Sequence, residues 1–164
     1  MKWEFQDLQR NPSCIDIVGV SPPILYIAQF LVRQGCNIRL IDKGFVSKRD
    51  IERGVLLTYK DVGDPKAVAA KKALKKINKT PIIKGFHEDL TETTAYLLSS
   101  DVVINATFDE EVAALCPENT LHIHEDLSFS RSTTTFQDKK RKDLAVKQYF
   151  ESIGNIIEEV YKIV

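Results

Sequence analysis

One acid in this sequence is placed where it could bind a nucleoside. Asp42 closes the short apolar segment 37–42 and follows the turn at Gly19. An acid about 20 residues beyond such a turn can accept hydrogen bonds from both hydroxyls of a ribose. The structural alternative is a solvated acid at the end of a strand. We therefore take Asp42 as a candidate ligand-binding residue.

The cysteines and histidines give weaker signals. Three cysteines are widely spaced and form no CxxC pair, which disfavours a disulfide framework or a Cys-rich zinc site. Cys116 has no base near it in the sequence, so we expect a buried structural thiol. His122 and His124 alternate on a predicted strand, and we expect a half-exposed polar strand face. Two histidines alone are weak support for a metal site.

The apolar pattern alternates between short β-branched runs and segments with helical spacing. It predicts strands at 15–20, 37–42, 81–86, 101–107 and 121–125. It predicts helices at 24–32, around 48–53, and at 66–78, 92–100, 110–115 and 138–164. Strands that alternate with helices indicate an α/β, Rossmann-like fold, in which helices flank a mainly parallel sheet. We place no domain boundary and treat 1–164 as a single domain.

Parallel sheets bind ligands just outside the carboxyl ends of their strands. Here those ends are 19–23, 42–44 and 107–109. We expect the functional site where these three segments meet.

The C-terminal helix predicted over 138–164 carries a narrow apolar seam. Its apolar residues alternate spacings of four and three, as in a heptad repeat: Val146, Phe150, Ile153, Ile157, Val160 and Val164. Two interpretations stay open. The helix lies across the sheet, or the seam is a dimer contact.

The stretch 15–109 resembles the ThiF/MoeB/HesA family, the nucleotide-binding domain shared with ubiquitin-activating enzymes. The resemblance rests on the strand, turn and helix of 15–35, on Ile41-Asp42, on Arg53, on the block Lys60-Asp61-Val62-Gly63-Asp64-Pro65-Lys66-Ala67, on Lys76-Ile77-Asn78 and on the strand 101–107. The Asp-Val-Gly-x-Pro-Lys-Ala block is its most specific part. The resemblance implies an enzyme that uses ATP and Mg²⁺ to adenylate the C terminus of a ubiquitin-like sulfur carrier.

The resemblance also implies roles for single residues. Asp42 stands where the family has the acid that holds the ribose of ATP. Arg53 and Lys66 match family positions that contact the phosphates, and we expect them to be the catalytic residues. Cations placed there would stabilise the negative charge that develops on the α-phosphate and on pyrophosphate.

The turn after the first strand departs from the family's GxGxxG pattern. It reads Gly19-Val20-Ser21-Pro22-Pro23-Ile24, so only the first glycine remains. The two prolines remove backbone N–H donors that would otherwise face a phosphate. Ser21 could cap the next helix, with Pro22 as its first residue. Gly19 and Ser21 stay in the predicted cofactor-binding set.

The end of the fourth strand departs as well. The family's Asp-x-Thr-Asp-Asn reads Asn105-Ala106-Thr107-Phe108-Asp109 here, so the magnesium-binding acid aligns with Phe108. Asp109 comes one residue later and is the predicted metal ligand, since Mg²⁺ prefers oxygen ligands. Thr107 joins the predicted cofactor-binding residues.

Composition excludes several classes of protein. The chain has 164 residues, 43% hydrophobic and 28% charged, which is typical of one globular domain. Its 23 basic and 23 acidic residues balance, which disfavours nucleic-acid binding, so the run 139–142 is expected to be a solvated helix start. No apolar run approaches the roughly 20 residues of a membrane span. The segment 1–7 does not resemble a signal peptide, so a reducing cytoplasm is the expected location.

Three functions stay open. The first is the adenylyltransferase that the resemblance implies. The second is a catalytically inactive relative that acts as a binding module or partner subunit. The third is an NAD-type dinucleotide-binding domain, since Asp42 also suits an adenosine ribose. The resemblance further implies pairing, as a homodimer or hetero-oligomer.

Overall fold

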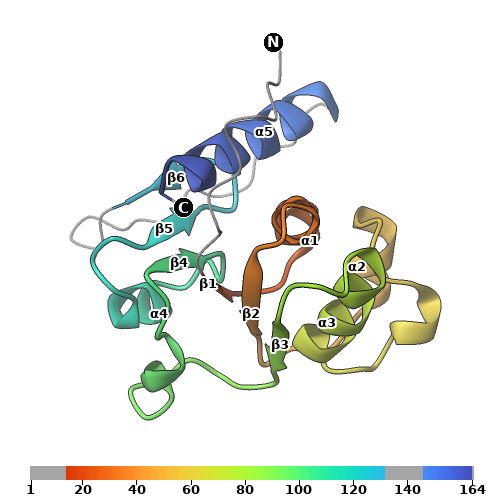
Figure 1. Cartoon of the computed structure of the whole chain (residues 1–164), viewed down its shortest axis with the longest axis horizontal. Helices are drawn as coiled ribbons and strands as arrows, with labels where there is room; N and C mark the ends of the chain where they lie inside the picture. Colours follow the sequence, from red (N-terminus) through yellow and green to blue (C-terminus); the bar gives the residue numbers. More distant parts are fainter. Residues whose placement is uncertain (1–13, 132–145, 164) are drawn as a thin grey trace.

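The computed structural model describes residues 14–131 and 146–163. Six strands form one sheet in the order β3-β2-β1-β4-β5-β6, in which only the edge strand β6 runs antiparallel to its neighbour (Figure 1). The strands are β1 (Cys14–Val18), β2 (Asn37–Ile41), β3 (Ile83–Phe86), β4 (Val102–Asn105), β5 (Leu121–Ile123) and β6 (Phe129–Ser130). The predicted α/β fold with a mainly parallel sheet is confirmed.

The helices agree with the sequence pattern at most positions. The α-helices are α1 (Pro22–Arg33), α2 (Lys48–Arg53), α3 (Lys66–Ile77), α4 (Glu110–Leu115) and α5 (Val146–Ile163), and short 3₁₀ turns are η2 (Tyr59–Asp61) and η3 (Ala95–Leu97). None of the helices in the described ranges has the length and apolar character that a membrane span needs.

The predicted helix over 92–100 is wrong, because only the 3₁₀ turn η3 forms there. The hydroxyl of Thr94 accepts a hydrogen bond from the Thr91 N–H (2.8 Å) and donates to the carbonyl of Asp89 (2.5 Å). Thr93 also contacts the Thr91 hydroxyl, at 2.9 Å. Side chains that bond nearby backbone in this way offer an alternative to the helix.

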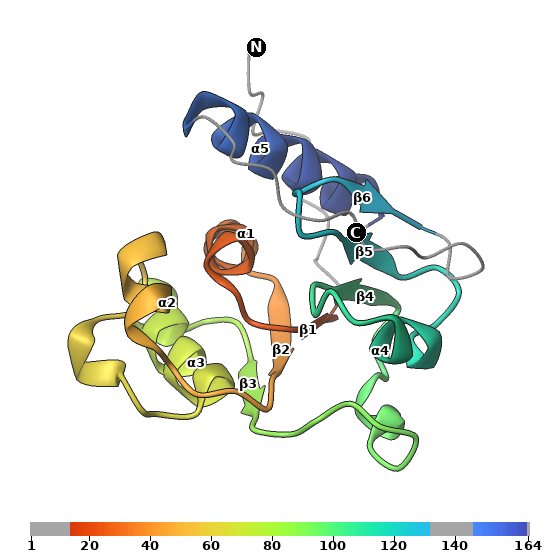
Figure 2. The ribbon, with the colours of Figure 1, turned by 180° about the vertical axis from the view of Figure 1, so that it is seen from behind.

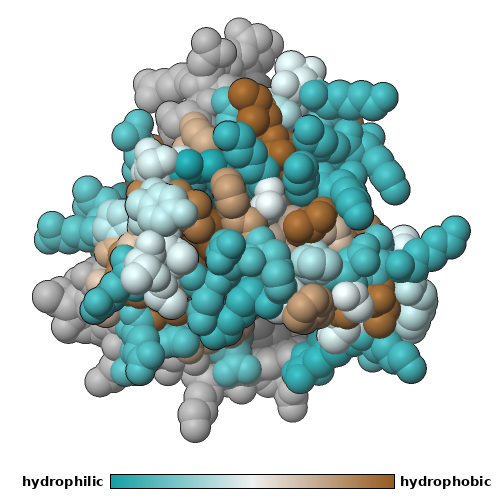
Figure 3. Space-filling model, turned by 90° about the horizontal axis from the view of Figure 1, so that it is seen from below, coloured by the Kyte–Doolittle hydropathy of each residue, from teal (hydrophilic) through white to brown (hydrophobic). Residues whose placement is uncertain are grey.

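The two faces of the sheet are covered differently. Residues such as Ile15 and Ile17 pack in a large apolar cluster with α1, α3 and α5. On the other face, Val18 and Ile41 pack in a smaller cluster with α4. Figures 1 and 2 show α1 and α5 on one side of the sheet and α4 on the other. Seen from below, the surface is mainly hydrophilic, with apolar residues visible between the charged ones (Figure 3).

The C-terminal helix packs within its own chain. Its side chains Ile153, Ile156, Ile157 and Val160 are buried in the large cluster. Tyr26 of α1 contacts the ring of Phe150 edge-on, with centroids 5.8 Å apart. These contacts confirm a helix packed on the sheet domain, and the dimer contact stays a prediction. The expected helix start at 138–145 and Val164 lie outside the described residues, as do the segments 1–7 and 139–142.

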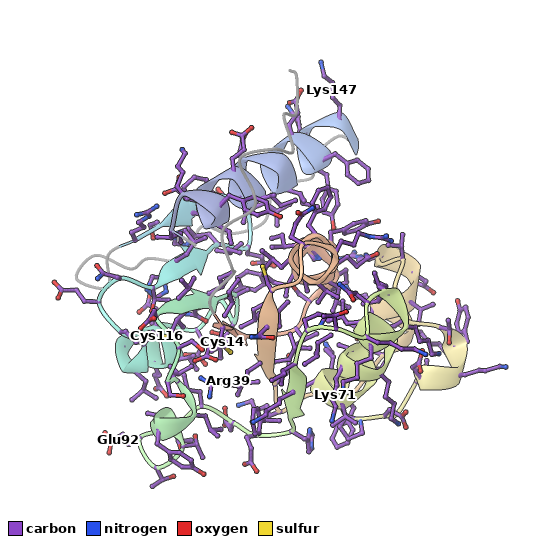
Figure 4. The ribbon with its side chains drawn as sticks, viewed as in Figure 1. Cys14, Arg39, Lys71, Glu92, Cys116 and Lys147 are labelled. Carbon is purple, nitrogen blue, oxygen red and sulfur yellow. The ribbon has the colours of Figure 1, made fainter. Side chains whose placement is uncertain are left out.

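A buried ion pair crosses the face opposite α1. Asp16 of β1 is fully buried and accepts two hydrogen bonds of 2.6 Å from Arg39 of β2. The backbone N–H groups of Ser99 and Ser100 donate to the same carboxylate, each at 3.0 Å. Figure 4 shows Arg39 and Cys14 near each other on this side of the sheet. The pair therefore anchors the segment that leads into β4 and on to the cleft described next.

Candidate functional site

A cleft with a volume of about 260 Å³ opens at the carboxyl ends of β1, β2 and β4. This is the edge at which parallel sheets bind ligands, and it is where the sequence placed the site. Six of the seven predicted site residues line the cleft: Gly19, Ser21, Asp42, Lys66, Thr107 and Asp109.

The carboxylate of Asp42 is held by two backbone donors. Its Oδ2 accepts a hydrogen bond from the N–H of Val20, and its Oδ1 accepts one from the N–H of Gly44, both at 2.6 Å. Each carboxylate oxygen has a further lone pair for a ligand. The side chain is half-buried in the cleft wall, so Asp42 is an oriented acceptor rather than a freely solvated acid.

Gly19 makes this arrangement sterically possible. Its φ of +87° is unfavourable for other residues, and a Cβ there would lie 2.8 Å from the backbone carbonyl of Ala106. Its N–H donates to the carbonyl of Ile41 at 2.9 Å. The turn after β1 can therefore pass against the end of β4 and present the N–H of Val20 to Asp42.

Ser21 occupies the N-cap position of α1, as predicted, but its hydroxyl makes no capping hydrogen bond. Pro22 and Pro23 take the first two helical positions and have no N–H, which removes one of the usual partners of an N-cap side chain. The Ser21 Oγ is buried and makes no hydrogen bond to the described part of the chain. Because the oxygen itself is buried, Ser21 lines the cleft without offering this hydroxyl at its surface.

Lys66, the first residue of α3, is fixed by an acid that the sequence analysis missed. Its Nζ donates to Oδ1 of Asp50 at 3.1 Å. Asp50 also accepts hydrogen bonds from the N–H (2.8 Å) and hydroxyl (2.7 Å) of Ser47. Burial opposes ionisation of Asp50, but the bonds from Ser47 and Lys66 outweigh it and lower its pKa. The Ser47-x-x-Asp50 spacing, typical of a helix cap, was the signal available in the sequence.

The structure brings Asp42 and Lys66 together but leaves Arg53 outside. A Cβ at Gly44 would lie 2.9 Å from Asp42 Oδ1 and 3.9 Å from Lys66 Cε. Arg53 is exposed in the last turn of α2 and does not line the cleft. Its contact with a phosphate stays a prediction.

The end of β4 is tied into the protein interior. The N–H and hydroxyl of Thr107 donate to Oδ1 of Asn105 at 3.1 and 2.8 Å. Asn105 Nδ2 lies 3.2 Å from His122 Nδ1, and both residues are buried. Burial, followed by the charge of His124, lowers the pKa of His122. The neutral ring therefore supports the Asn105 amide, and the Thr107 hydroxyl hydrogen points to Asn105 and away from the cleft.

The expectation of a half-exposed face at His122 and His124 is wrong. The two side chains are 0% and 2% exposed, and His122 packs against Asn105 of the neighbouring strand β4. His124 Nε2 lies 3.0 Å from the Ser130 hydroxyl of β6. Cys116 is buried, as expected, and its burial raises the pKa of the thiol to about 12.

Asp109, the predicted metal ligand, caps α4. Its Oδ1 accepts hydrogen bonds from the N–H groups of Glu111 (2.9 Å) and Val112 (3.4 Å). Phe108 also lines the cleft, with a left-handed φ of 59°. Within 14–131 and 146–163, no group of three or more His, Cys, Asp or Glu side chains is placed to hold a metal ion. These residues do not fit a bound Mg²⁺ on their own.

The sequence profile of the ThiF family matches residues 25–116, which is more than half of the chain. The chain belongs to the ThiF family. Over 96 residues it is 36% identical to the ubiquitin-like modifier-activating enzyme ATG7 of Candida glabrata, covering 55% of this chain and 15% of that protein. Over 107 residues it is 32% identical to the sulfur carrier protein adenylyltransferase of Thermus thermophilus, covering 63% and 39%. The chain thus spans less than half the length of these two ThiF-like relatives.

Solved structures agree on the fold. E. coli MccB, in its structure with MccA, superposes with a TM-score of 0.72 at 16% identity, over 97% of this chain and 57% of that one. E. coli tRNA N6-threonylcarbamoyladenosine dehydratase, TcdA, in complex with AMP, gives 0.60 at 24% identity, over 69% and 48%. At these identities the likeness shows that the fold is shared.

Proposed function

We propose that this ThiF-family domain binds an adenine nucleotide in the cleft and holds its ribose on Asp42. The observation that carries the proposal is the orientation of Asp42, whose two oxygens are held by the N–H groups of Val20 and Gly44. The structure of TcdA with AMP is of a protein with the same fold. ThiF-family membership also favours a nucleotide over an NAD-type dinucleotide.

The cleft offers different chemistry to each part of such a ligand. Asp42 would accept hydrogen bonds from the two ribose hydroxyls. Leu90 and Val112 supply apolar surface for the base. Lys66, one of two lysines among the described lining residues, lies beside Gly44 and Asp42.

Calorimetric titration with AMP and with its 2′,3′-dideoxy analogue tests the ribose contact without altering the protein. We expect the dideoxy analogue to bind at least about tenfold more weakly, because hydrogen bonds to a charged group contribute about 1.5–3 kcal/mol. Asp42→Asn should weaken AMP binding as well. Asp101→Asn, which neutralises an exposed acid before β4 that does not line the cleft, should leave it unchanged. Equal binding of AMP and its dideoxy analogue would refute the ribose role.

The geometry favours binding without adenylyl transfer. Two prolines begin α1, Phe108 stands where the family has an acid, and Arg53 lies outside the cleft. We therefore place the catalytically inactive hypothesis, a binding module or partner subunit, first. The ubiquitin-like carrier, the homodimer or hetero-oligomer and the cytoplasmic location stay proposals that rest on the family resemblance and, for the location, on composition.

Adenylyl transfer to a sulfur carrier is the second candidate. It is favoured by the position of Lys66 beside Asp42 and by the 32% identity to the Thermus thermophilus adenylyltransferase. In that case Arg53 would have to move to the phosphates, and Asp109 would have to leave its capping role to bind Mg²⁺. ATP–pyrophosphate exchange with Mg²⁺ and a ubiquitin-like carrier measures this activity. Exchange that is lost in Lys66→Ala would establish this candidate, and background exchange would exclude it.

A further inference from the structure

We infer that the cleft selects a free ribonucleoside over the corresponding triphosphate. This inference rests on the proposed function, because it takes the ribose to lie on Asp42. It names the class of ligand, which is an uncharged nucleoside or at most a monophosphate.

The first reason is the charge of the cleft lining. Of the described residues that line it, Asp42, Glu88, Asp89 and Asp109 are acidic, and Lys43 and Lys66 are basic. Both lysines are already paired with acids. Lys43 Nζ lies 2.9 Å from Asp89, and Lys66 Nζ lies 3.1 Å from Asp50. The remaining lining acids are Asp42, Glu88 and Asp109. They give the lining a net negative charge, which repels each added phosphate.

The second reason is that the starts of α1 and α4 at the cleft cannot bind a phosphate well. Phosphates bind helix N-termini through backbone N–H groups that have no partner within the helix. In α1, Pro22 and Pro23 have no N–H, and the N–H of Leu25 donates to the carbonyl of Ser21 at 3.0 Å. In α4, the N–H groups of Glu111 and Val112 bond to the carboxylate of Asp109, which adds a negative charge at that end.

The third reason is the set of hydrogen-bonding groups that remains. The Asp42 carboxylate suits the two ribose hydroxyls. The oxygen of Thr107 can accept a hydrogen bond, because its hydrogen is directed to Asn105. These groups match a neutral ligand rich in hydroxyl and amine donors.

Calorimetric titration of the whole chain with adenosine, AMP and ATP, with and without Mg²⁺, tests the inference. At low salt we expect adenosine to bind at least about tenfold more tightly than ATP, with AMP between them. At about 1 M salt the difference between adenosine and ATP affinity should become smaller, because salt screens the repulsion and ATP then binds more tightly. Adenosine binding should change little.

Variants that remove lining acids test whether the charge of the cleft causes the preference for adenosine over ATP. Glu88→Gln/Asp109→Asn should narrow the ratio of adenosine to ATP affinity several-fold, and asparagine at 109 still caps α4. Asp101→Asn makes the same type of change on a residue outside the cleft lining and should leave the ratio unchanged. Circular dichroism of each variant checks that it folds.

The outcomes separate this inference from the proposed function. ATP binding as tight as adenosine binding, or tighter, overturns the inference and leaves nucleotide binding at Asp42 intact. An unchanged ratio in the double variant overturns the charge argument. Failure of adenosine, AMP and ATP alike to bind overturns both the inference and the proposed function.

Discussion

The two walls of the cleft are built in different ways. The first wall consists of Gly19, Asp42 and Lys66, at the ends of β1 and β2 and the start of α3. Its binding carboxylate is held by backbone N–H groups. The second wall is the segment 105–112, between β4 and α4, and its polar side chains bond mainly to one another, to His122 and to the start of α4.

The difference indicates which wall binds the ligand. In the first wall, each carboxylate oxygen of Asp42 accepts one backbone hydrogen bond and keeps a further lone pair for a ligand. In the second wall, Asn105 and Asp109 use hydrogen-bonding capacity to support Thr107 and α4. Changes to the side chain of Asp42 should therefore weaken binding, whereas changes in the second wall, or at the backbone contact between Gly19 and Ala106, should mainly alter stability.

The largest effect is expected from Gly19→Ala. Its cost combines a left-handed φ, about 1–2 kcal/mol, with a Cβ placed 2.8 Å from Ala106, so we expect a loss of about 2–4 kcal/mol in the free energy of unfolding. Gly35→Ala is the matched control, because Gly35 has a φ of +85° and no atom within 4 Å of the added Cβ. Urea unfolding measures both variants. Equal losses would show that the close approach to β4 is unimportant.

Asn105→Ala should have the next largest effect. It leaves the N–H and hydroxyl of Thr107 and the nearby nitrogen of His122 without this partner, which costs about 1–3 kcal/mol. Thr107→Val removes only the hydroxyl and should cost less. Thermal unfolding compares the two, while titration with AMP follows binding. A larger loss of AMP binding in Asn105→Ala than in Asp42→Asn would contradict the distinction between the two walls.

A smaller effect is expected from pH. Burial lowers the pKa of His122 from 6.5, so the unfolded chain takes up this proton before the folded one. The free energy of unfolding should be constant above pH 6.5 for this group and should fall below it, by about 1 kcal/mol per pH unit until the folded pKa is reached. Urea unfolding at pH 7.5 and 5.5 measures the slope. His122→Asn should reduce this slope of the free energy of unfolding against pH. His87→Asn, at an exposed position, should leave the slope unchanged. A slope in His122→Asn equal to that of the wild type would refute the assignment of the pH dependence to His122.

The smallest effect is expected from Phe108→Asn. Phe108 adopts a φ of 59°, which asparagine tolerates better, and its side chain is half-buried. We expect the free energy of unfolding to rise by about 0.5 kcal/mol. Leu127→Asn is the contrasting case, because Leu127 has a φ of 63° but is 6% exposed, so the loss of apolar burial should dominate. Similar destabilisation of both variants would show that strain at Phe108 is negligible.

Much of the fold could be predicted because it depends on local patterns. Apolar runs of four to six residues marked the strands, and helical spacing marked α1 and α3. The helix predicted over 92–100 was wrong, because the side chain of Thr94 bonds to backbone groups there and a helix does not form. The burial of His122 and His124 was missed because it depends on neighbours from other strands, Asn105 of β4 and Ser130 of β6.

The cleft was predictable only in part. Asp42 and Lys66 were found because each follows a recognisable pattern of neighbours in the chain. The Asp50–Lys66 pair and the Asn105–His122 contact were missed, because each joins residues of two different elements. The Asp16–Arg39 pair is a further example, since it depends on the register in which β1 and β2 align.

Neighbouring residues thus specified the α/β class, the edge of the sheet that holds the site and the acid that faces it. Folding in three dimensions decided that Lys66 pairs with Asp50, that Arg53 does not line the cleft and that most of the charged residues lining it are acids. The physical reason is the separation along the chain of the residues that interact. Backbone preferences act over a few residues and are visible in the chain, whereas burial and charge pairing depend on which distant segments the folded sheet brings into contact.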